Sequence, residues 1–284
     1  GSVKDVADVM RDHYEGTPMD MTQDIGAGGN ALPYRWRPMG FTYDGKEYTN
    51  ERAIATQQTA FWFVGQSRGN YPDVLGGIIW FGTDDAATSY VTPIYTNSEI
   101  VPECFREGNG DMLTYSSTSS FWLNNRVANA CYKMYNYMAP FVREHIDRFE
   151  NSQISEGVPQ TDAKALELYN DIAEKEMKKQ SKKNPGYDPM TDTGDAFLQV
   201  KQYLTSYSVS TADAIFSAWK KMEETLLVKF IDGNVKAQNE DGTFVHSPES
   251  EGIPDGLTQP GYTEYWKEAV AHFHGDVVKK VEAE

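Results

Sequence analysis

Several chemically versatile side chains gather near the start of the chain, in the stretch RDHYEGT. His13, flanked by Asp12 and Glu15, has the side-chain type of a general base or a metal ligand. No second ligand lies at helical spacing from it, which argues against a metal site. We expect Arg11, Asp12 and Glu15 to form a structural ionic cluster that fixes the end of a short helix over residues 3–10 against a sheet.

Four consecutive polar residues, TQQT at 56–59, interrupt a segment that is otherwise rich in Ala, Phe, Trp and Val. Polar side chains in a buried strand need hydrogen-bond partners. Glutamine amides can donate to and accept from a peptide-like ligand. We therefore expect Gln57, Gln58 and Thr59 to line a substrate cleft. Cross-strand hydrogen bonding within the sheet is an equally weighted alternative.

Two adjacent acids, Asp84 and Asp85, follow an apolar run that reads as a strand. They could orient the amine of a substrate, and we include them as substrate-binding candidates. The alternative is that they are turn residues with Asx-type hydrogen bonds. Three asparagines of a later helical segment, Asn124, Asn125 and Asn129, are expected to be buried caps or bridges to loops without a chemical role.

The charge balance excludes some partners. The chain has 284 residues with 26 basic and 42 acidic side chains, a formal net charge of −16. Nucleic-acid backbones and anionic membranes would be repelled over most of the surface. No apolar run approaches the roughly 20 residues that span a bilayer. The chain opens with Gly1-Ser2, which resembles the remnant of a removed tag, so a signal peptide could have been cut away without trace and the compartment stays open.

No familiar cofactor or metal motif is present. The two cysteines, Cys104 and Cys131, cannot form a disulfide framework or, without histidines at metal-ligand spacing, a zinc site. We expect both to be reduced and structural. The sequence contains no glycine-rich phosphate loop after a strand, no His-Glu-x-x-His and no Gly-x-Ser-x-Gly. We therefore expect neither a cofactor nor a metal.

Strand patterns dominate residues 32–96, where aromatic and β-branched runs alternate with turn signals. The Asp-Gly at the centre of residues 41–49 predicts a hairpin. Residues 53–67 read as one long strand, and residues 76–85 and 88–95 as an antiparallel pair. The best fit is a buried antiparallel sheet.

Helical periodicity begins near residue 118. A second helix is expected over 162–181, and a third is expected to begin near Ser210 and to stop at Asp232-Gly233. The expected loops are 182–195 and 237–261.

Strands that precede helices are typical of an α+β protein rather than of alternating parallel units. We expect a strand-rich part over 1–117 and a helical extension over 118–284, packed on it.

Seven blocks of the sequence resemble one family. In order along the chain they are MRDHYEGTPMDMT, RWRP, ERAIATQQTAFWFVGQSR, GGIIWFGTDDA, TPIY, FWLNNRVAN and YLTSYSVSTADAIFSAWKKM. Together they resemble the later half of the cysteine dipeptidases related to dipeptidase A, within the N-terminal-nucleophile (Ntn) hydrolases.

The resemblance implies a four-layer αββα sandwich that hydrolyses dipeptides. In this family the thiolate of an N-terminal cysteine attacks, and the α-amino group of that cysteine serves as base. An α-amine has a pKa near 8 and a thiol near 8.5, so the pair can exchange a proton at neutral pH without a histidine. His13 is then not needed for catalysis.

Neither cysteine of this chain matches the nucleophile of the family. Cys104 and Cys131 are internal, so each carries an amide nitrogen in place of a basic amine. We expect the C-terminal portion of a dipeptidase, with no catalytic residue of its own and inactive alone. Its expected partners are a dipeptide and the N-terminal half of the same protein, and an uncovered sheet face would favour self-association. The alternative is a non-catalytic peptide- or glycan-binding module, suggested by the aromatic content and the missing nucleophile.

Overall fold

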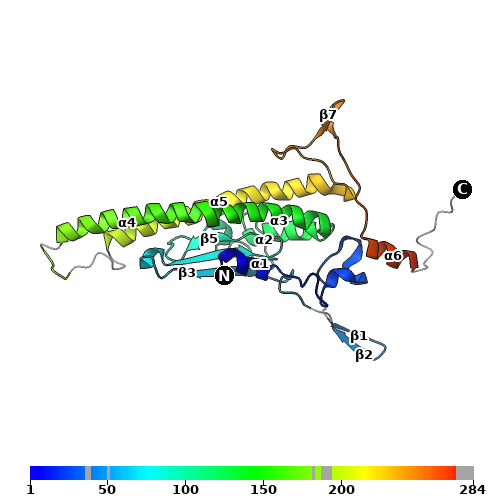
Figure 1. The fold of residues 1–284 in the computed structure, drawn as a ribbon, viewed down its shortest axis with the longest axis horizontal. Coiled ribbons are helices and arrows are strands. Elements are labelled where there is room, and N and C mark those ends of the chain that lie inside the picture. Colours follow the sequence, from blue (N-terminus) through cyan, green and yellow to red (C-terminus); the bar gives the residue numbers. More distant parts are fainter. Residues whose placement is uncertain (36–39, 50–51, 181–182, 187–193, 273–284) are drawn as a thin grey trace.

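The computed structural model describes residues 1–35, 40–49, 52–180, 183–186 and 194–272. Within these residues the chain is an α+β protein in which a small antiparallel sheet lies against long helices (Figure 1). The helices are α1 (Val3–Met10), α2 (Ser120–Cys131), α3 (Tyr135–Ser152), α4 (Val158–Gln180), α5 (Asp195–Phe230) and α6 (Glu264–His272). The strands are β1 (Gly40–Tyr43), β2 (Lys46–Thr49), β3 (Phe61–Ser67), β4 (Gly77–Thr83), β5 (Thr92–Tyr95), β6 (His246–Ser247) and β7 (Ser250–Pro254).

The central sheet has the order β3-β4-β5, with both pairs antiparallel. The predicted pairing of the segments that form β4 and β5 is confirmed. Successive side chains of a strand point to opposite faces. Trp62 and Val64 of β3 and Trp80 of β4 are therefore buried on one face, in contact with the helices.

The other face of this sheet, which we call the bare face, carries exposed apolar side chains. Phe61 is 59% exposed, Phe63 53% and Ile79 38%. The central sheet thus has one apolar face covered by helices and one exposed.

The predicted long strand over 53–67 is wrong in its first half. Only Phe61–Ser67 forms a strand. Thr56 begins a turn, in which the amide of Thr59 donates to the carbonyl oxygen of Thr56 at 3.1 Å. The Thr56 hydroxyl also accepts from the amide of Gln58 at 3.2 Å. Threonine hydroxyls compete with the strand ladder for backbone groups in this way.

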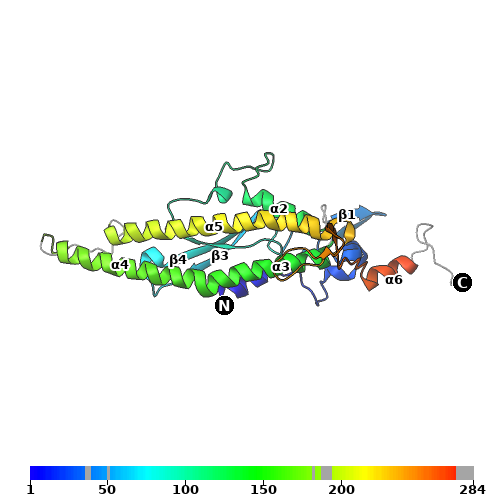
Figure 2. The ribbon, with the colours of Figure 1, turned by 90° about the horizontal axis from the view of Figure 1, so that it is seen from above.

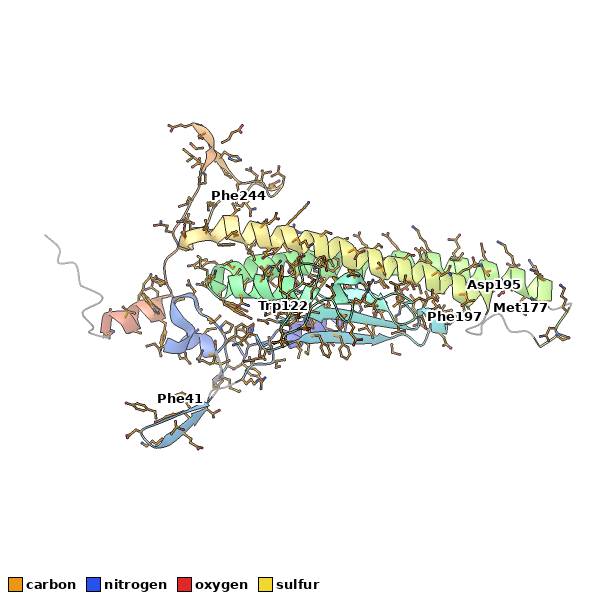
Figure 3. The ribbon with its side chains drawn as sticks, turned by 180° about the vertical axis from the view of Figure 1, so that it is seen from behind. Phe41, Trp122, Met177, Asp195, Phe197 and Phe244 are labelled. Atoms are coloured by element: carbon orange, nitrogen blue, oxygen red, sulfur yellow. The ribbon has the colours of Figure 1, made fainter. Side chains whose placement is uncertain are left out.

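The predicted hairpin over 41–49 is confirmed as β1 and β2, but it is not part of a buried sheet. Asp44 has a φ of +48° and Gly45 a φ of +71°, as a two-residue turn of the primed type requires. All eight strand residues are exposed. Figure 3 shows Phe41 on this hairpin, which projects from the body of the molecule.

The helices differ from prediction mainly at their starts. The helix expected from residue 118 is two helices, α2 and α3. Helix α4 begins at Val158, where a π turn (Gln153–Gly157) joins it to α3. Helix α5 begins at Asp195 rather than near Ser210. Its stop is confirmed, because Asp232 and Gly233 have φ values of +59° and +76°.

The early start of α5 has a local explanation. Several serines and threonines inside it hydrogen bond to the backbone one turn earlier. Thr205 Oγ1 donates to the carbonyl oxygen of Lys201 at 2.8 Å, and Ser208 Oγ donates to that of Leu204 at 2.9 Å. Hydroxyls bonded in this way are tolerated inside a helix, so Ser210 is not a cap.

The predicted loop over 237–261 contains the short strands β6 and β7 and is therefore wrong in part. The predicted loop over 182–195 lies largely outside the described residues. No helix of the described ranges is long and apolar enough to cross a membrane.

Two core clusters hold the helices and the sheet together. The sheet core lies between β3–β5 and the α4–α5 pair, which run side by side along one face of the sheet (Figures 1 and 2). The helical core lies among α2, α3 and the later part of α5. Strands and helices thus pack together in the sheet core, and the division into parts at 117 and 118 stays a proposal.

The predicted helix over residues 3–10 is confirmed as α1. Its start is capped in both directions. The Ser2 hydroxyl accepts from the amide of Asp5 at 3.2 Å, and the Asp5 carboxylate accepts from the amide of Ser2 at 2.7 Å. This reciprocal pair satisfies two free backbone donors of the first turn.

Arg11 fixes the end of α1, but its partner is not the one expected. Its guanidinium forms a bidentate pair with Glu150 of α3, at 3.0 and 2.6 Å. The same group donates to the carbonyl oxygens of Ala86 and Ser89, at 2.9 and 3.1 Å. Both side chains are buried, with 2% and 1% exposed. The expected cluster of Arg11 with Asp12 and Glu15 is therefore wrong.

The reason is that the partner comes from distant sequence. Glu150 is 139 positions away, whereas Asp12 and Glu15 satisfy the backbone of their own turn. Of the acids close in sequence, Asp8 comes within 4.0 Å of the guanidinium, farther away than the two oxygens of Glu150.

The buried pair predicts a large loss of stability when one partner is removed. Glu150→Ala leaves the Arg11 charge buried and unpaired, and should lower the free energy of unfolding by about 3–5 kcal/mol. Urea unfolding at neutral pH measures this change.

The matched control is Glu144→Ala, which removes the exposed Arg148–Glu144 pair on the same helix. Exposed pairs contribute less than about 1 kcal/mol. Equal losses in the two variants would contradict the importance given to the buried pair.

Candidate functional site

The adjoining ends of β3 and β4 bring together the two groups of side chains singled out in the sequence. Phe61, which begins β3, pairs with Thr83, which ends β4. Beyond this pair, the amide of Asp84 donates to the carbonyl oxygen of Ala60 at 3.0 Å. The Thr56–Thr59 turn and the two acids therefore lie at the same end of the sheet. We call Asp84, Asp85 and the side chains bonded to them the acid corner.

Asp84 is a buried carboxyl group on a left-handed backbone. Its φ is +67°, a region that aspartate enters more readily than most residues. Asn125 Nδ2 donates to Oδ1 at 2.9 Å, whereas no partner among the described residues reaches Oδ2. Burial raises the pKa of Asp84 to about 7, against the smaller lowering effect of the Asn125 bond. The group therefore changes between acid and carboxylate near neutral pH.

Asp85 is held at both carboxylate oxygens. Oδ1 accepts from the amide of Ala87 at 3.0 Å, the Asx-type bond expected of a turn residue. Oδ2 accepts from the Tyr132 hydroxyl at 2.9 Å. The charge of Asp85 lies close to the Tyr34 hydroxyl. Burial, reinforced by the charge of Asp85, raises the pKa of Tyr34 and of Tyr132 far above the ordinary value, so both hydroxyls keep their protons.

His13 is hydrogen bonded to Tyr34. Its Nε2 is 2.7 Å from the Tyr34 hydroxyl, and its Nδ1 is 2.9 Å from Glu15 Oε1. The histidine side chain is 3% exposed and that of Glu15 55%. The hydrogen bond from His13 lowers the pKa of Glu15. Hydrogen bonds thus link Glu15 at the surface, through His13, to the buried Tyr34 hydroxyl.

The residues predicted to form a cleft wall line only a small cavity in this chain. Gln57 Nε2 donates to the carbonyl oxygen of Arg35 at 2.8 Å, and Thr59 Oγ1 donates to that of Thr56 at 2.8 Å. Gln58 bonds within the same turn. With Met21 and Tyr34 on the opposite side, the turn lines a cavity of about 10 Å³. Such a cavity holds at most one water molecule.

Asn124 and Asn125 of α2 act as bridges, as expected, whereas Asn129 is exposed and bonds only within the helix. Asn124 Nδ2 donates to the carbonyl oxygen and the hydroxyl of Thr83, at 3.2 and 3.0 Å. Asn125 bonds to Asp84, and Asn129 Nδ2 donates back to the carbonyl oxygen of Asn125 at 2.8 Å. Helix α2 is therefore tied to the end of β4 at the acid corner.

The two cysteines are free and buried, which confirms their structural assignment. Burial raises the pKa of Cys104 to about 12 and moves that of Cys131 still higher. Neither thiol forms a thiolate at neutral pH. Across the described ranges, no group of three or more His, Cys, Asp or Glu side chains is arranged to hold a metal ion.

Sequence reasoning missed the two tyrosines of the acid corner. Tyr34 follows a turn-rich segment and Tyr132 ends α2, and neither belongs to a motif. The aromatic content, 13% of the chain, was the one available signal, and it does not point to particular residues.

A large cavity lies elsewhere, near the C-terminal end of α5. Its volume is about 1160 Å³, and its walls include Arg126, Glu223 and Tyr262. The Arg126 guanidinium is already paired with Glu223, at 2.5 and 2.7 Å. None of the side chains predicted to bind substrate lines this cavity.

The chain matches a known protein family. The family model described as peptidase family C69 matches residues 2–148, which include α1, the central sheet, α2 and most of α3. The block YLTSYSVSTADAIFSAWKKM lies outside the matched residues. No curated protein matches the chain.

The raised pKa of Asp84 predicts a pH-dependent stability. The ordinary pKa of the group is 3.8, and in the folded chain it is about 7. The folded chain then binds more protons than the unfolded chain between these values, so stability falls as pH rises through this window. The contribution from Asp84 is about 4 kcal/mol between pH 4 and pH 8. Asp84→Asn should remove it, as measured by urea unfolding at a series of pH values.

Asp44→Asn is the control, because Asp44 also has a left-handed backbone but lies in the exposed hairpin. It should keep the pH dependence of the parent chain. If Asp84→Asn keeps it too, Asp84 does not titrate near neutral pH.

Proposed function

The chain belongs to peptidase family C69, and on this premise we propose that it forms the C-terminal portion of a dipeptidase. The proposed substrate is a dipeptide, and the proposed partner is the N-terminal half of the same protein. Together the two portions would form the αββα sandwich of an Ntn hydrolase, with the long helices of this chain as an extension.

The attacking thiol in this proposal belongs to the other portion. Family C69 peptidases are cysteine peptidases, and Cys104 and Cys131 are both buried with raised pKa values. Both also lack an α-amine that could act as base. The proposal therefore assigns no catalytic residue to this chain.

The bare face of the central sheet is the observation that carries the proposal of a complementary portion. Phe61 and Phe63 of β3 stand exposed on it, and so does Ile79 of β4, which pairs with Gly65, two positions after Phe63. Contiguous exposed apolar side chains of this kind mark a surface that is covered in the functional state. A second sheet stacked on this face would bury them, at the spacing of about 10 Å typical of packed sheets.

The acid corner is the proposed site for the ammonium group of the substrate. Asp84 has a carboxylate oxygen that no described residue satisfies, and an ammonium group would favour its ionised form. Asp85 supports it from the next position. Gln57, Gln58 and Thr59, at the same end of the sheet, are the proposed substrate wall once the second portion completes the cleft.

Reconstitution tests the proposal. The chain is mixed with a segment that begins at a cysteine and supplies the N-terminal half, and dipeptide cleavage is measured by release of free amino acids. We expect cleavage by the complex and none by either portion alone. A complex verified by gel filtration that does not cleave dipeptides would contradict the proposed function.

Phe63→Asp tests the bare face within the same assay. The side chain is 53% exposed, so the change should cost the isolated chain less than about 1 kcal/mol. It would bury a charge in the complex, and complex formation and cleavage should both be lost. Tyr43→Asp in the exposed hairpin is the control and should leave both intact.

The second candidate is a non-catalytic peptide- or glycan-binding module. It is supported by Phe41 and Tyr48, which stack on the exposed hairpin with ring centroids 5.1 Å apart. Isothermal titration of the chain with peptides and glycans tests it. Absence of heat with a folded, monodisperse sample would remove this candidate.

A further inference from the structure

The large cavity near the C-terminal end of α5 has no part in the proposed function, and distant parts of the chain build it. Its volume is about 1160 Å³. Arg126 lines it from α2, Leu226 from α5 and Asn30 from the short helical segment Ile25–Asn30. Tyr262 adds a further wall, from the segment that passes the end of α5 on its way to α6 (Figure 1).

Hydrogen bonds between these parts hold the frame of the cavity. Asn30 Nδ2 donates to the carbonyl oxygen of Lys133 at 3.0 Å. The Arg126 guanidinium is bonded to Glu223, which joins α2 to α5, and it also donates to the Tyr115 hydroxyl at 2.6 Å. The cavity is therefore formed before a ligand enters, which lowers the entropy cost of binding.

The floor of the cavity is apolar. Leu226 and Phe230 are buried there, and Met134 belongs to the same core cluster. Leu227 and Ile231, four positions apart, also line the cavity, yet they are 65% and 45% exposed. A ligand with apolar side chains would cover these two residues and remove their surface from water.

Charged side chains of both signs border this floor. Lys133 comes just after α2, whereas Glu224 lies in α5 and Asp232 just after it. Among the described residues, none forms an ion pair with any of these three side chains. Arg126 and Glu223 also line the cavity, but they neutralise each other. The charges left for a ligand are therefore one cation after α2 and two anions of the α5 side.

This charge pattern favours a dipolar ligand with an apolar body. A carboxylate would pair with Lys133, and an ammonium group with Glu224 or Asp232. A fatty acid has no ammonium group, so it would match only one of the two sides. Pockets for small ligands usually have volumes of about 300–1,000 Å³. The larger volume here suits a peptide of a few residues better than a single amino acid.

We propose that this cavity binds a short peptide that has apolar side chains and free amino and carboxyl ends. The proposal is independent of the proposed function. None of the side chains assigned to the substrate cleft lines the cavity, and the experiment uses the chain alone.

Isothermal titration with the tripeptide leucyl-alanyl-leucine tests the proposal, because this probe has two apolar side chains and two free ends. We expect saturable binding at one site. Leu227→Ser should weaken the affinity about tenfold through loss of apolar contact. The control is Leu198→Ser, on the early turns of the same helix, where Leu198 is 40% exposed and lies outside the cavity. It should keep the affinity of the parent chain. Circular dichroism and thermal unfolding verify that both variants fold.

Blocked forms of the probe locate its two ends. Acetylation of the amino end should weaken binding about fivefold in the parent chain, as expected for an exposed ion pair, and clearly less in Glu224→Gln. Amidation of the carboxyl end should weaken binding to a similar extent in the parent chain, and have no further effect in Lys133→Gln. Glu167→Gln and Lys221→Gln are the controls, because both residues are exposed and lie outside the cavity. They should respond to both blocked forms as the parent chain does.

Four results would overturn the proposal. The first is no binding of the probe at two temperatures, and the second is an affinity that Leu227→Ser leaves unchanged. The third is equally tight binding of laurate, which has a carboxylate and an apolar chain but no ammonium group. The fourth is a parent dimer in gel filtration that Leu227→Ser converts to a monomer, since this face would then be an interface between two copies of the chain.

Discussion

The buried pair of Arg11 and Glu150 is the interaction on which the rest of the arrangement depends. It joins the end of α1 to α3 and, through the carbonyl oxygens of Ala86 and Ser89, to the segment that follows the acid corner. Glu150 also accepts from the amide of Val91, just before β5. One pair of opposite charges therefore sets the distance between the first helix, the sheet and the helical layer.

The Arg11–Glu150 pair and the acid corner differ in how far their buried charges are compensated by neighbouring groups. Glu150 has a cation and a backbone donor, and its charge is fully compensated. Asp84 has one amide donor and keeps an oxygen without a described partner, so its carboxyl group favours the protonated form. A buried group that is left incompletely satisfied beside a well-satisfied one is the pattern expected of a binding position rather than of a framework position.

Local patterns in the sequence predicted local structure well. The helix over 3–10, the Asp-Gly hairpin, the antiparallel pair β4–β5 and the stop of α5 all depend on neighbouring residues, and all were found. The errors occurred where short-range and long-range signals compete. The TQQT segment read as a strand because apolar residues flank it, yet its threonine hydroxyls close a turn. Ser210 read as a cap, although hydroxyls inside α5 bond back to the preceding turn.

Only part of the candidate site could be predicted from the sequence. The acids were visible as a polar pair at a strand end, and Asn124 and Asn125 of α2 as bridges. The Tyr132 hydroxyl that holds Asp85 could not be found, because the fold and no sequence spacing brings it to this acid. The same holds for Glu150, which reaches Arg11 from 139 positions away.

Helix α5 is long enough to take part in both hydrophobic cores. Its 36 residues extend over about 54 Å, and its early turns contribute Val200 and Leu204 to the sheet core while its later turns contribute Trp219 and Leu226 to the helical core. Neither core can unfold without disrupting part of helix α5. The two cores should therefore melt as a single cooperative unit, with the slowest amide exchange in the middle of α5, where both clusters protect the backbone.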